Sequence, residues 1–379
     1  MSDTLAIDSA TVRLFRIPPA TAMEDATHVV TRIEFILVEL TSGDSKATGL
    51  GYTAGVGGTA TAALLRDDCL PHLIGRDARD IGAIWQNLRD HLYRTGFGAV
   101  TTLALAAIDT ALWELNGLAD GQPLWQRAGA ATPGIPAYAS LIDLRPPGTL
   151  GEHLATLRAE GYDWFKIKVG LPNLDDDLAR LAAAREAIGP DAKLSVDANM
   201  GLDLEEAVRR ARAFAPFNLA WFEEPLPAED ILGHASLRAQ TGIPVAVGES
   251  LYTPDEIALY LRAEAVDIVQ ADIARIGGIT PWLRTADLAH AAGLPIAPHY
   301  MAEWAVHLLP AIPNGLVLEN VLGAGLADVG LAAPGYRIET GRALPPDGAG
   351  HGIRFRLTEN TAHEIPLGPL LITPERSHK

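Results

Sequence analysis

From about residue 135 onward the chain repeats one pattern, a short apolar strand followed by a helical segment. In order, these strands read IPAYASL, WFKIKVG, KLSVDAN, LAWFEEP, PVAVGES, VDIVQAD, PIAPHY and LVLEN. Eight such strands that alternate with helices indicate a parallel barrel rather than a sandwich. The sequence therefore predicts an α/β fold of the (β/α)8-type TIM barrel.

The residues before this pattern predict a separate α+β capping domain. Stretches of alternating or β-branched residues predict strands at 9–17, 31–40 and 47–54, with a turn at Thr41-Ser42-Gly43-Asp44. Apolar residues at helical spacing predict helices at 60–74, 80–92 and 99–119. The predicted division is a cap over residues 1–128, a barrel over 129–325, and a C-terminal segment over 326–379 that packs back on the cap.

Composition excludes several classes of function. The formal net charge of −17 leaves no general basic surface for nucleic acid or anionic lipid. No apolar run reaches the roughly 18 residues that cross a bilayer, and the N-terminal MSDTLAIDSA lacks the pattern of a signal peptide. The single cysteine, Cys69, excludes an intrachain disulfide framework and a cysteine-rich zinc site. We therefore expect a cytoplasmic protein that binds neither nucleic acid nor a membrane.

Polar residues end the predicted barrel strands, which is where a TIM barrel has its active site. Along the chain these strand ends carry Lys166, Lys168, Asp197, Asn199, Glu223, Glu224, Glu249, Asp272, His299 and Glu319. Because side chains alternate along a strand, Lys166 and Lys168 are expected on one face, and Asp197 and Asn199 on one face of the next strand.

Three of these carboxylates predict a metal site. Asp197, Glu223 and Glu249 end three successive strands, and unpaired carboxylates at one point would repel one another strongly. A divalent cation between them resolves that repulsion, and oxygen-only ligands favour Mg²⁺, with Mn²⁺ as an alternative, over zinc. Glu224 is expected to point to the other face and to support the site or form a salt bridge.

Lys168 is the candidate base. Two ammonium groups close together and near a cation lower each other's pKa, which lets one lysine be neutral near neutral pH. Lys166 is expected to hold the substrate carboxylate. An isolated Lys-x-Lys is more often an exposed charge pair, but the carboxylates on the next three strands favour the catalytic interpretation.

His299 is the candidate second acid/base. Asp272 ends the preceding strand, and a carboxylate bonded to one imidazole nitrogen leaves the other free to exchange protons with substrate. Glu319, if protonated, could donate a hydrogen bond to the substrate carboxylate as it gains charge, and a rim ion pair is the alternative. Ser140 and Tyr138, on the first strand, could add a hydrogen bond to substrate.

These motifs resemble the enolase superfamily, in its mandelate racemase subgroup. The resemblance covers essentially the whole chain, through LALAAIDTALWEL in the cap, KIK at 166–168, VDAN at 196–199, WFEEP at 221–225, GES at 248–250, QADIARIGGIT at 270–280 and Pro298-His299. It implies Mg²⁺ ligands at Asp197, Glu223 and Glu249. It also implies a base at Lys168, a second acid/base in the His299–Asp272 dyad, substrate contacts at Lys166 and Glu319, and a polar position beside the metal at Asn199.

The chemistry that the resemblance implies is removal of the α-proton of a carboxylate to give an enediolate. Members with both a Lys-x-Lys and a His–Asp dyad are more often acid-sugar dehydratases. We therefore predict dehydration of an aldonate or aldarate to a 2-keto-3-deoxy acid. The same residues would also suit a racemase or epimerase of a 2-hydroxy acid or an amino-acid derivative, and a non-catalytic metal-stabilised binding barrel is a third reading. Cycloisomerases and dipeptide epimerases of sister subgroups usually have a lysine where this chain has His299.

Two cap loops, 18–30 and 52–59, are expected to set specificity. The first contains Glu24, Asp25 and His28 among small residues, which suits a polyhydroxylated substrate better than a phenyl ring. His28 is included among the predicted substrate contacts. The expected partner is a small carboxylate, and the family's usual assemblies predict a homo-oligomer.

Overall fold

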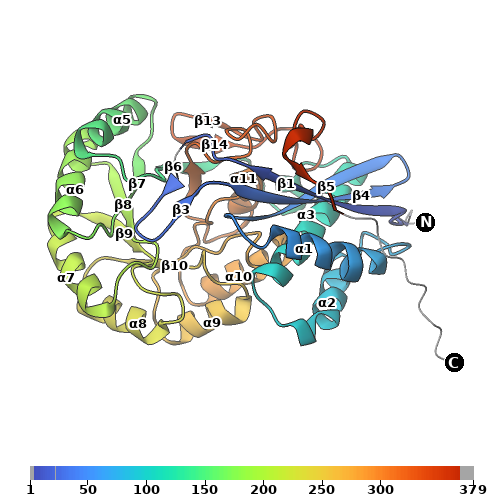
Figure 1. Cartoon of the computed structure of the whole chain (residues 1–379), viewed down its shortest axis with the longest axis horizontal. Helices are drawn as coiled ribbons and strands as arrows, with labels where there is room; N and C mark the ends of the chain where they lie inside the picture. The colour runs from blue at the N-terminus through green and yellow to red at the C-terminus, as the bar shows by residue number, and fades with distance from the viewer. Residues whose placement is uncertain (1–3, 22, 368–379) are drawn as a thin grey trace.

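The structure, a computed structural model, describes residues 4–21 and 23–367 of the 379-residue chain. Figure 1 shows helices curving around a parallel sheet at one end of the molecule, and a long antiparallel sheet with helices beside it at the other. The α/β barrel with a cap is therefore confirmed. No helix in the two described ranges has the length and hydropathy needed to span a bilayer. The cytoplasmic location stays a prediction.

The cap is built on a four-stranded antiparallel sheet in the order β15-β1-β4-β5. Its strands are β1 (Ser9–Ile17), β4 (Ile33–Ser42), β5 (Ser45–Thr53) and β15 (Glu364–Ile365). The hairpin between β4 and β5 turns at Gly43, whose φ of 55° is a left-handed conformation that glycine adopts without strain. The three strands predicted near the N-terminus are present, and the fourth comes from the C-terminal segment.

Helix α3 (Ala99–Asp120) lies directly on β5. A Cβ atom at Gly49 would lie 2.1 Å from the carbonyl oxygen of Ala107, and one at Gly51 would lie 2.5 Å from that of Leu103. The two glycines therefore allow the backbones of helix and strand to touch. This contact fixes the end of β5 relative to α3.

The other cap helices are α1 (Gly58–Leu64), α2 (Ile81–His91) and α4 (Leu124–Arg127). The single helix predicted over 60–74 is wrong, because α1 continues as a π-helical turn over Leu65–Cys69 and a 3₁₀ turn over Leu70–His72. Pro71 has no amide proton for an α-helical hydrogen bond, so a regular helix does not run through it. Leu65 and Cys69 are nevertheless buried, so the stretch keeps the apolar spacing from which a helix was predicted.

The barrel strands are β6 (Ile135–Ser140), β7 (Trp164–Lys168), β8 (Lys193–Asp197), β9 (Leu219–Glu223), β10 (Val245–Val247), β11 (Ile268–Val269) and β12 (Leu318–Val321). They pair in parallel in chain order from β6 to β11, and β12 pairs with β6. Ile296 supplies the seventh strand position through parallel bridges to Val269 and Gly315. These contacts close the barrel.

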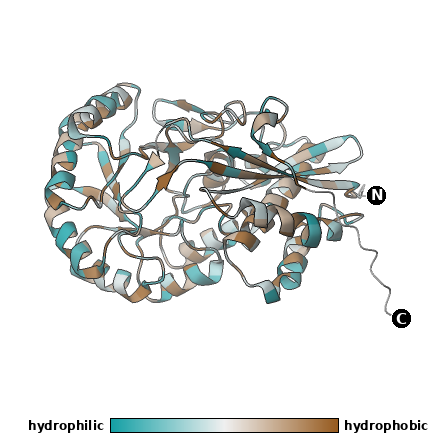
Figure 2. Cartoon of the chain, in the orientation of Figure 1, coloured by the Kyte–Doolittle hydropathy of each residue, from teal (hydrophilic) through white to brown (hydrophobic). Residues whose placement is uncertain are grey.

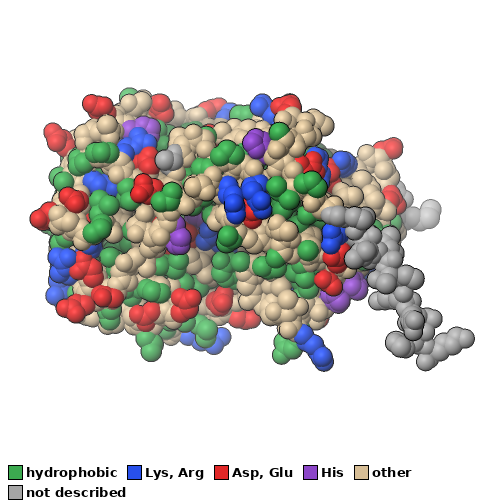
Figure 3. Space-filling view, viewed as in Figure 1, with side chains coloured by type: hydrophobic (Ala, Val, Ile, Leu, Met, Phe, Trp, Pro, Cys, Tyr) green, Lys and Arg blue, Asp and Glu red, His purple; other side chains and the backbone are tan. Residues whose placement is uncertain are grey.

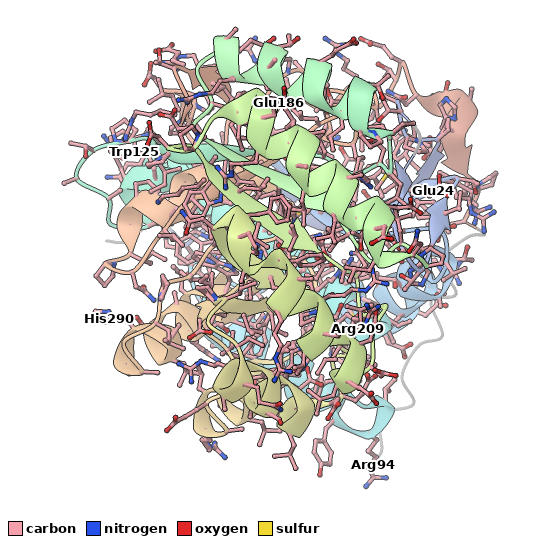
Figure 4. All side chains as sticks on the ribbon, turned by 90° about the vertical axis from the view of Figure 1, so that its left-hand side faces the viewer. Glu24, Arg94, Trp125, Glu186, Arg209 and His290 are labelled. Carbon is pink, nitrogen blue, oxygen red and sulfur yellow. The ribbon has the colours of Figure 1, made fainter. Side chains whose placement is uncertain are left out.

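The barrel helices are α5 (Pro147–Ala159), α6 (Leu174–Ile188), α7 (Leu204–Phe214), α8 (Ile231–Gln240), α9 (Pro254–Arg262), α10 (Ile279–Ala291) and α11 (Ala302–Leu308). Side-chain caps start several of them; Asp203 accepts from the amide of Glu206, and Thr253 and Glu256 form a capping box. Figure 2 shows polar residues on the outer surfaces of these helices, and Figure 4 shows Glu186 and Arg209 on the outer surfaces of α6 and α7. The helices therefore bury their apolar sides against the strands.

The barrel interior is packed with aromatic rings. The ring of Trp221 lies 4.9 Å from that of Trp164 and 5.3 Å from that of Tyr138, and Tyr138 is fully buried. Tyr138 is not among the residues that line the cavity at the barrel mouth. The predicted substrate contact at Tyr138 is therefore wrong, because its side chain belongs to the packed interior.

The C-terminal segment contacts both parts of the molecule. The hairpin of β13 (Arg337–Glu339) and β14 (Arg342–Leu344) pairs with β6 of the barrel, whereas β15 pairs with β1 of the cap. Residues 368–379 of the predicted segment lie outside the described residues. The domain boundaries at 128 and 325 stay predictions.

A short hairpin of β2 (Met23–Glu24) and β3 (Val29–Val30) lies over the barrel mouth, so the predicted loop 18–30 contains regular structure. Residue 22 of that loop lies outside the described residues. The amide of Glu24 donates to the carbonyl of Ile142, and the hydroxyl of Thr27 donates to the carbonyl of Asn199. The hairpin therefore rests on the loops that follow β6 and β8.

Candidate active site

Three buried carboxylates meet at the carboxyl ends of adjacent strands. Asp197 and Glu223 are the last residues of β8 and β9, and Glu249 follows β10 by two residues. Gly248, with φ 152°, makes the turn before Glu249, where a Cβ would lie 2.7 Å from the backbone of Gln270. One oxygen from each carboxylate lies within 4.8 Å of the other two.

This cluster fits a divalent cation. Burial raises the pKa of Glu223 to about 8, and the neighbouring carboxylates of Asp197 and Glu249 add to that rise against the attraction of Lys166. Three carboxylates so close together are stable in their ionised form only with positive charge between them. Because the donors are all oxygens, the set suits Mg²⁺ better than zinc.

Lys166 and Lys168 point from β7 toward these carboxylates. Lys168 Nζ lies 2.6 Å from Asp197 Oδ2, and Lys166 Nζ lies 2.6 Å from Glu223 Oε1. Burial opposes the charge on both lysines, but the carboxylates outweigh burial and raise both pKa values. Among the protein's own groups, the lowering of the Lys168 pKa by Lys166 is smaller than the rise caused by Asp197.

His299 and Asp272 form the predicted pair. Nδ1 of His299 lies 2.7 Å from Asp272 Oδ2, and its Nε2 lies 3.5 Å from Glu249 Oε2. Burial lowers the pKa of His299, but Glu249 and Asp272 outweigh it and raise the value above the usual range. The two imidazole nitrogens therefore have distinct surroundings, with Nδ1 on Asp272 and Nε2 toward the carboxylate cluster.

Glu319 is held in an ion pair. Its Oε1 lies 2.7 Å from Lys166 Nζ and accepts a hydrogen bond from Ser140 Oγ, and its Oε2 accepts one from the amide of Tyr300. Burial favours the neutral form, but Lys166 outweighs it and lowers the pKa of Glu319. Of the two interpretations of Glu319 that the sequence left open, the ion pair fits the structure, and Ser140 contacts Glu319 as well as lining the cavity.

Asn199 and Glu224 lie just beyond their strands, in left-handed conformations with φ of 44° and 35°. Strand alternation does not apply there, so the expectation that Asp197 and Asn199 share a face cannot rest on it. The amide of Asn199 donates to Asp197 Oδ1, while its side-chain Oδ1 is buried without a hydrogen-bond partner among the described residues, and Asn199 lines the cavity. Glu224 accepts hydrogen bonds from the amide and hydroxyl of Ser250, which agrees with a supporting position.

A cavity of about 120 Å³ lies over these groups. Lys166, Lys168, Asn199, Glu249, His299 and Glu319 reach it from the barrel. The cap side adds acidic and apolar residues, which include Glu24 and Asp25 of the predicted loop 18–30: Met23, Glu24, Asp25, Val30, Ile33, Tyr52 and Ala54.

His28 lines an adjoining cavity of about 330 Å³ instead. Its side chain is 66% exposed, and its Nδ1 lies 2.6 Å from the hydroxyl of Thr27. Asp25, Asn199 and Glu249 line both cavities, so the two are neighbours at the barrel mouth. The structure therefore places His28 at the outer edge of the predicted site.

The sequence analysis included two further residues of the site only within longer segments, Tyr52 in the cap loop 52–59 and Arg275 in the motif QADIARIGGIT. Tyr52 reaches Asp272 with its hydroxyl, and Arg275 Nη1 donates to the carbonyl oxygen of Glu249 and lies 3.3 Å from its Oε1. Arg275 is part of the QADIARIGGIT motif, so its position three residues after Asp272 was a usable signal. The loop 52–59 was expected to set specificity, but nothing in the sequence indicated that Tyr52 contacts Asp272.

Comparison with known proteins identifies the family. Residues 149–359 match the enolase C-terminal domain-like family, and residues 9–129 match the N-terminal domain of the mandelate racemase / muconate lactonizing enzyme family. The chain is 37% identical over 351 residues to 3,6-anhydro-alpha-L-galactonate cycloisomerase from Streptomyces coelicolor, covering 92% of this chain and 96% of that protein.

Solved structures show the same architecture with bound ligands. A racemase from Streptomyces coelicolor A3(2) with bound magnesium matches with a TM-score of 0.90 and 34% identity, over 95% of this chain and 100% of that one. An L-talarate dehydratase from Polaromonas sp. JS666, complexed with Mg and L-glucarate, matches with a TM-score of 0.89 and 32% identity, over 96% and 99%. These relatives are a cycloisomerase, a racemase and a dehydratase, and the chain belongs to the mandelate racemase and muconate lactonizing enzyme family of the enolase superfamily.

Proposed function

We propose that this protein dehydrates an acid sugar to a 2-keto-3-deoxy acid by removing the proton next to the carboxylate. The observation that carries the proposal is the placement of two proton-transfer groups around one carboxylate cluster. Lys168 comes from β7 and His299 from the segment after Ile296, with the carboxylates of β8, β9 and β10 between them in the order of the sheet. A substrate carboxylate at the cluster would have its α-carbon within reach of both groups.

Asp197, Glu223 and Glu249 would hold Mg²⁺, which when bound supplies positive charge for the substrate carboxylate and competes with Lys168 for Asp197. Lys166, which lines the cavity, would orient the substrate carboxylate, and Glu319 would hold Lys166 in place. Asn199, with its unpartnered side-chain oxygen, would accept a hydrogen bond from a substrate hydroxyl.

In the proposed reaction, one group acts as base and the other as acid. Neutral Lys168 or His299 takes the α-proton, and the electron pair of that C–H bond forms a double bond as the β-hydroxyl leaves. The protonated partner gives its proton to that hydroxyl, which departs as water. The resulting enol becomes the 2-keto-3-deoxy acid, so the only products are that acid and water.

A racemase or epimerase is the second candidate, and it uses the same two groups. One would remove the α-proton and the other would return a proton to the opposite face, with the hydroxyls retained. The racemase with 34% identity makes this a specific alternative. The fate of the β-hydroxyl separates the two functions.

The deciding experiment is incubation of the Mg²⁺-loaded protein with a panel of aldonates and aldarates in D₂O, followed by proton NMR. A 2-keto-3-deoxy product supports the dehydratase. Deuterium at the α-carbon with all hydroxyls retained supports the racemase or epimerase. The Lys168→Ala variant should lose turnover by at least about a hundredfold, whereas unchanged turnover would contradict the assignment of the base. The expected homo-oligomer is a separate prediction.

A further inference from the structure

The hydroxyl of Tyr52, at the end of cap strand β5, contacts the acid/base pair of His299 and Asp272. It donates a hydrogen bond to Asp272 Oδ2, the same oxygen that lies 2.7 Å from His299 Nδ1. The hydroxyl oxygen also lies 3.3 Å from that nitrogen. Tyr52, Asp272 and His299 therefore form one hydrogen-bonded group in which two donors share one carboxylate oxygen.

The other oxygen of Asp272 is already occupied. Asp272 Oδ1 accepts hydrogen bonds from the amides of Ala274 and Arg275 at 2.7 and 2.9 Å. The carboxylate is fully buried and has donors on both oxygens, so it has little freedom to rotate. The direction of the Nδ1 hydrogen bond of His299 then depends on where Tyr52 holds Oδ2.

Tyr52 is itself rigidly placed. Its ring packs 4.5 Å from that of Tyr300, and Gly51 beside it lies against the backbone of Leu103 on α3. The side chain is 5% exposed. The phenol therefore has one position, set by the packing of β5 on α3.

The cap also forms hydrogen bonds with the segment that follows Asp272. Trp85 Nε1 donates to the carbonyl of Gly277 at 2.9 Å, and Asp109 Oδ2 accepts from the amide of Thr280 at 2.9 Å. A Cβ at Gly278 would lie 2.5 Å from that of Asp109. Both ends of the Tyr52–Asp272 hydrogen bond are therefore anchored to α2 and α3 of the cap.

We propose that Tyr52 is a positioning residue that fixes the imidazole of His299 through Asp272, so that the cap completes one half of the acid/base pair. Lys168 has no hydrogen bond to Tyr52, Asp272 or His299 among the contacts of the described residues, and its partner is Asp197. Loss of the phenol should therefore slow proton exchange on the substrate face next to His299 and leave exchange on the face next to Lys168 unchanged. The kinetic test of this inference rests on the proposed function, because it needs a substrate. The spectroscopic test rests only on the hydrogen bonds described above.

The kinetic test is deuterium exchange at the α-carbon of aldonates epimeric at C2, with galactonate and talonate first, because one epimer presents its proton to Lys168 and the other to His299. Tyr52→Phe should slow the His299-facing exchange by about tenfold to a hundredfold, the usual effect of losing a partner behind a ligand or base. The Lys168-facing exchange should change less than about twofold.

Tyr260→Phe is the matched control, because its buried hydroxyl donates to the carbonyl of Ala228 instead. It should leave both exchanges unchanged. In an Asp272→Asn background, Tyr52→Phe should have little further effect, since it acts through Asp272. Equal slowing of both faces, or effects that simply multiply in the double variant, would overturn the proposal.

The second readout needs no substrate. In the ¹⁵N-labelled full chain, the Nδ1 proton of His299, identified by its loss in His299→Asn, should show a nuclear Overhauser contact with Tyr52. In Tyr52→Phe that proton should shift upfield and exchange faster with water. If wild type exchanges neither epimer but shows this signal, the proposed function fails and the positioning role stands. Absence of the contact in the folded wild-type chain overturns the positioning role whatever the kinetics show.

Discussion

The imidazole Nε2 of His351, in the C-terminal segment, lies 3.0 Å from the carbonyl oxygen of Thr48 on cap strand β5. The other nitrogen, Nδ1, accepts a hydrogen bond from the amide of Ile353 at 2.9 Å. Both nitrogens can therefore form these hydrogen bonds only when the ring is neutral, with its proton on Nε2. This buried histidine joins the C-terminal segment to the same strand that carries Tyr52.

The pairing predicts that the cap loses stability in acid. Burial lowers the pKa of His351 to about 4, against the hydrogen bond to Thr48, whereas an unfolded histidine titrates near 6.5. The unfolded chain therefore binds the extra proton between these values. The stabilisation is complete above about pH 6.5 and falls by about 3 kcal/mol as the pH drops to about 4.

Urea denaturation of wild type and His351→Gln across pH 7 to 4 measures this effect. The stability advantage of wild type should shrink as the pH falls, because the variant has no imidazole to protonate. Glu114, beside this ring, has a pKa raised to about 7 by burial and acts in the opposite sense, but it is present in both proteins. His290→Gln, on the outer surface in Figure 4, is the control. A pH-independent difference would contradict the prediction.

The barrel and its strand-end residues could be predicted because both follow local rules. Apolar strands that alternate with helices have one common parallel solution, and the last residues of those strands must lie at one end. The positions of Asp197 and Glu223 follow from that rule, and the turn at Gly248 brings Glu249 to them. The left-handed turn at Asn199 could not be predicted, because alternation stops where the strand stops.

The ionisation states and the cap contacts depend on side chains far apart in the sequence. Glu319 is ionised because Lys166, which is 153 positions earlier in the sequence, lies against it. The sequence alone had paired Lys166 with Lys168 and did not indicate this contact with Glu319. Tyr52 and Asp272 are likewise brought together only by the docking of cap and barrel. Acidic and basic side chains are mixed on the face shown in Figure 3, so the surface charge there does not indicate where the site lies.

The close contact of β5 and α3 predicts that Gly51→Ala destabilises the protein. The added methyl group would lie 2.5 Å from the carbonyl oxygen of Leu103, so strand and helix must separate, at a cost of about 3 kcal/mol. Gly82→Ala on α2, where no atom of residues 4–21 or 23–367 lies within 4 Å of the added one, should be neutral or stabilise by up to about 1 kcal/mol. Thermal melts of both variants measure this. Similar melting temperatures for the two variants would mean that strand and helix can separate without a measurable loss of stability.

The carboxylate cluster predicts one Mg²⁺ site that depends on all three acids. Asp197→Asn should weaken Mg²⁺ binding, measured by isothermal titration calorimetry, by at least about a hundredfold, because a charged oxygen ligand is lost from a buried site. Glu205→Gln, at an exposed position on α7, should leave the affinity unchanged. Chelation by EDTA should lower the melting temperature of wild type and not that of Asp197→Asn. Equal affinities in wild type and Asp197→Asn would place the ion elsewhere.

The charges around the cavity predict a preference for aldonates over aldarates of the same configuration. Its basic side chains are already paired, with Lys168 on Asp197, Lys166 on Glu223 and Arg275 on Glu249. The cap side of the cavity presents acids instead, at Glu24 and Asp25. The second carboxylate of an aldarate would therefore meet negative charge.

We expect kcat/KM for galactonate to exceed that for galactarate by about tenfold, a modest factor because Glu24 is exposed to solvent and its charge is screened. Glu24→Gln should narrow the ratio to about threefold, and higher salt should narrow it in wild type. Glu186→Gln, on the outer surface of α6, should leave it unchanged. A wild-type protein that uses galactarate equally well, and loses that ability in His28→Gln, would instead make His28 the group that receives the second carboxylate.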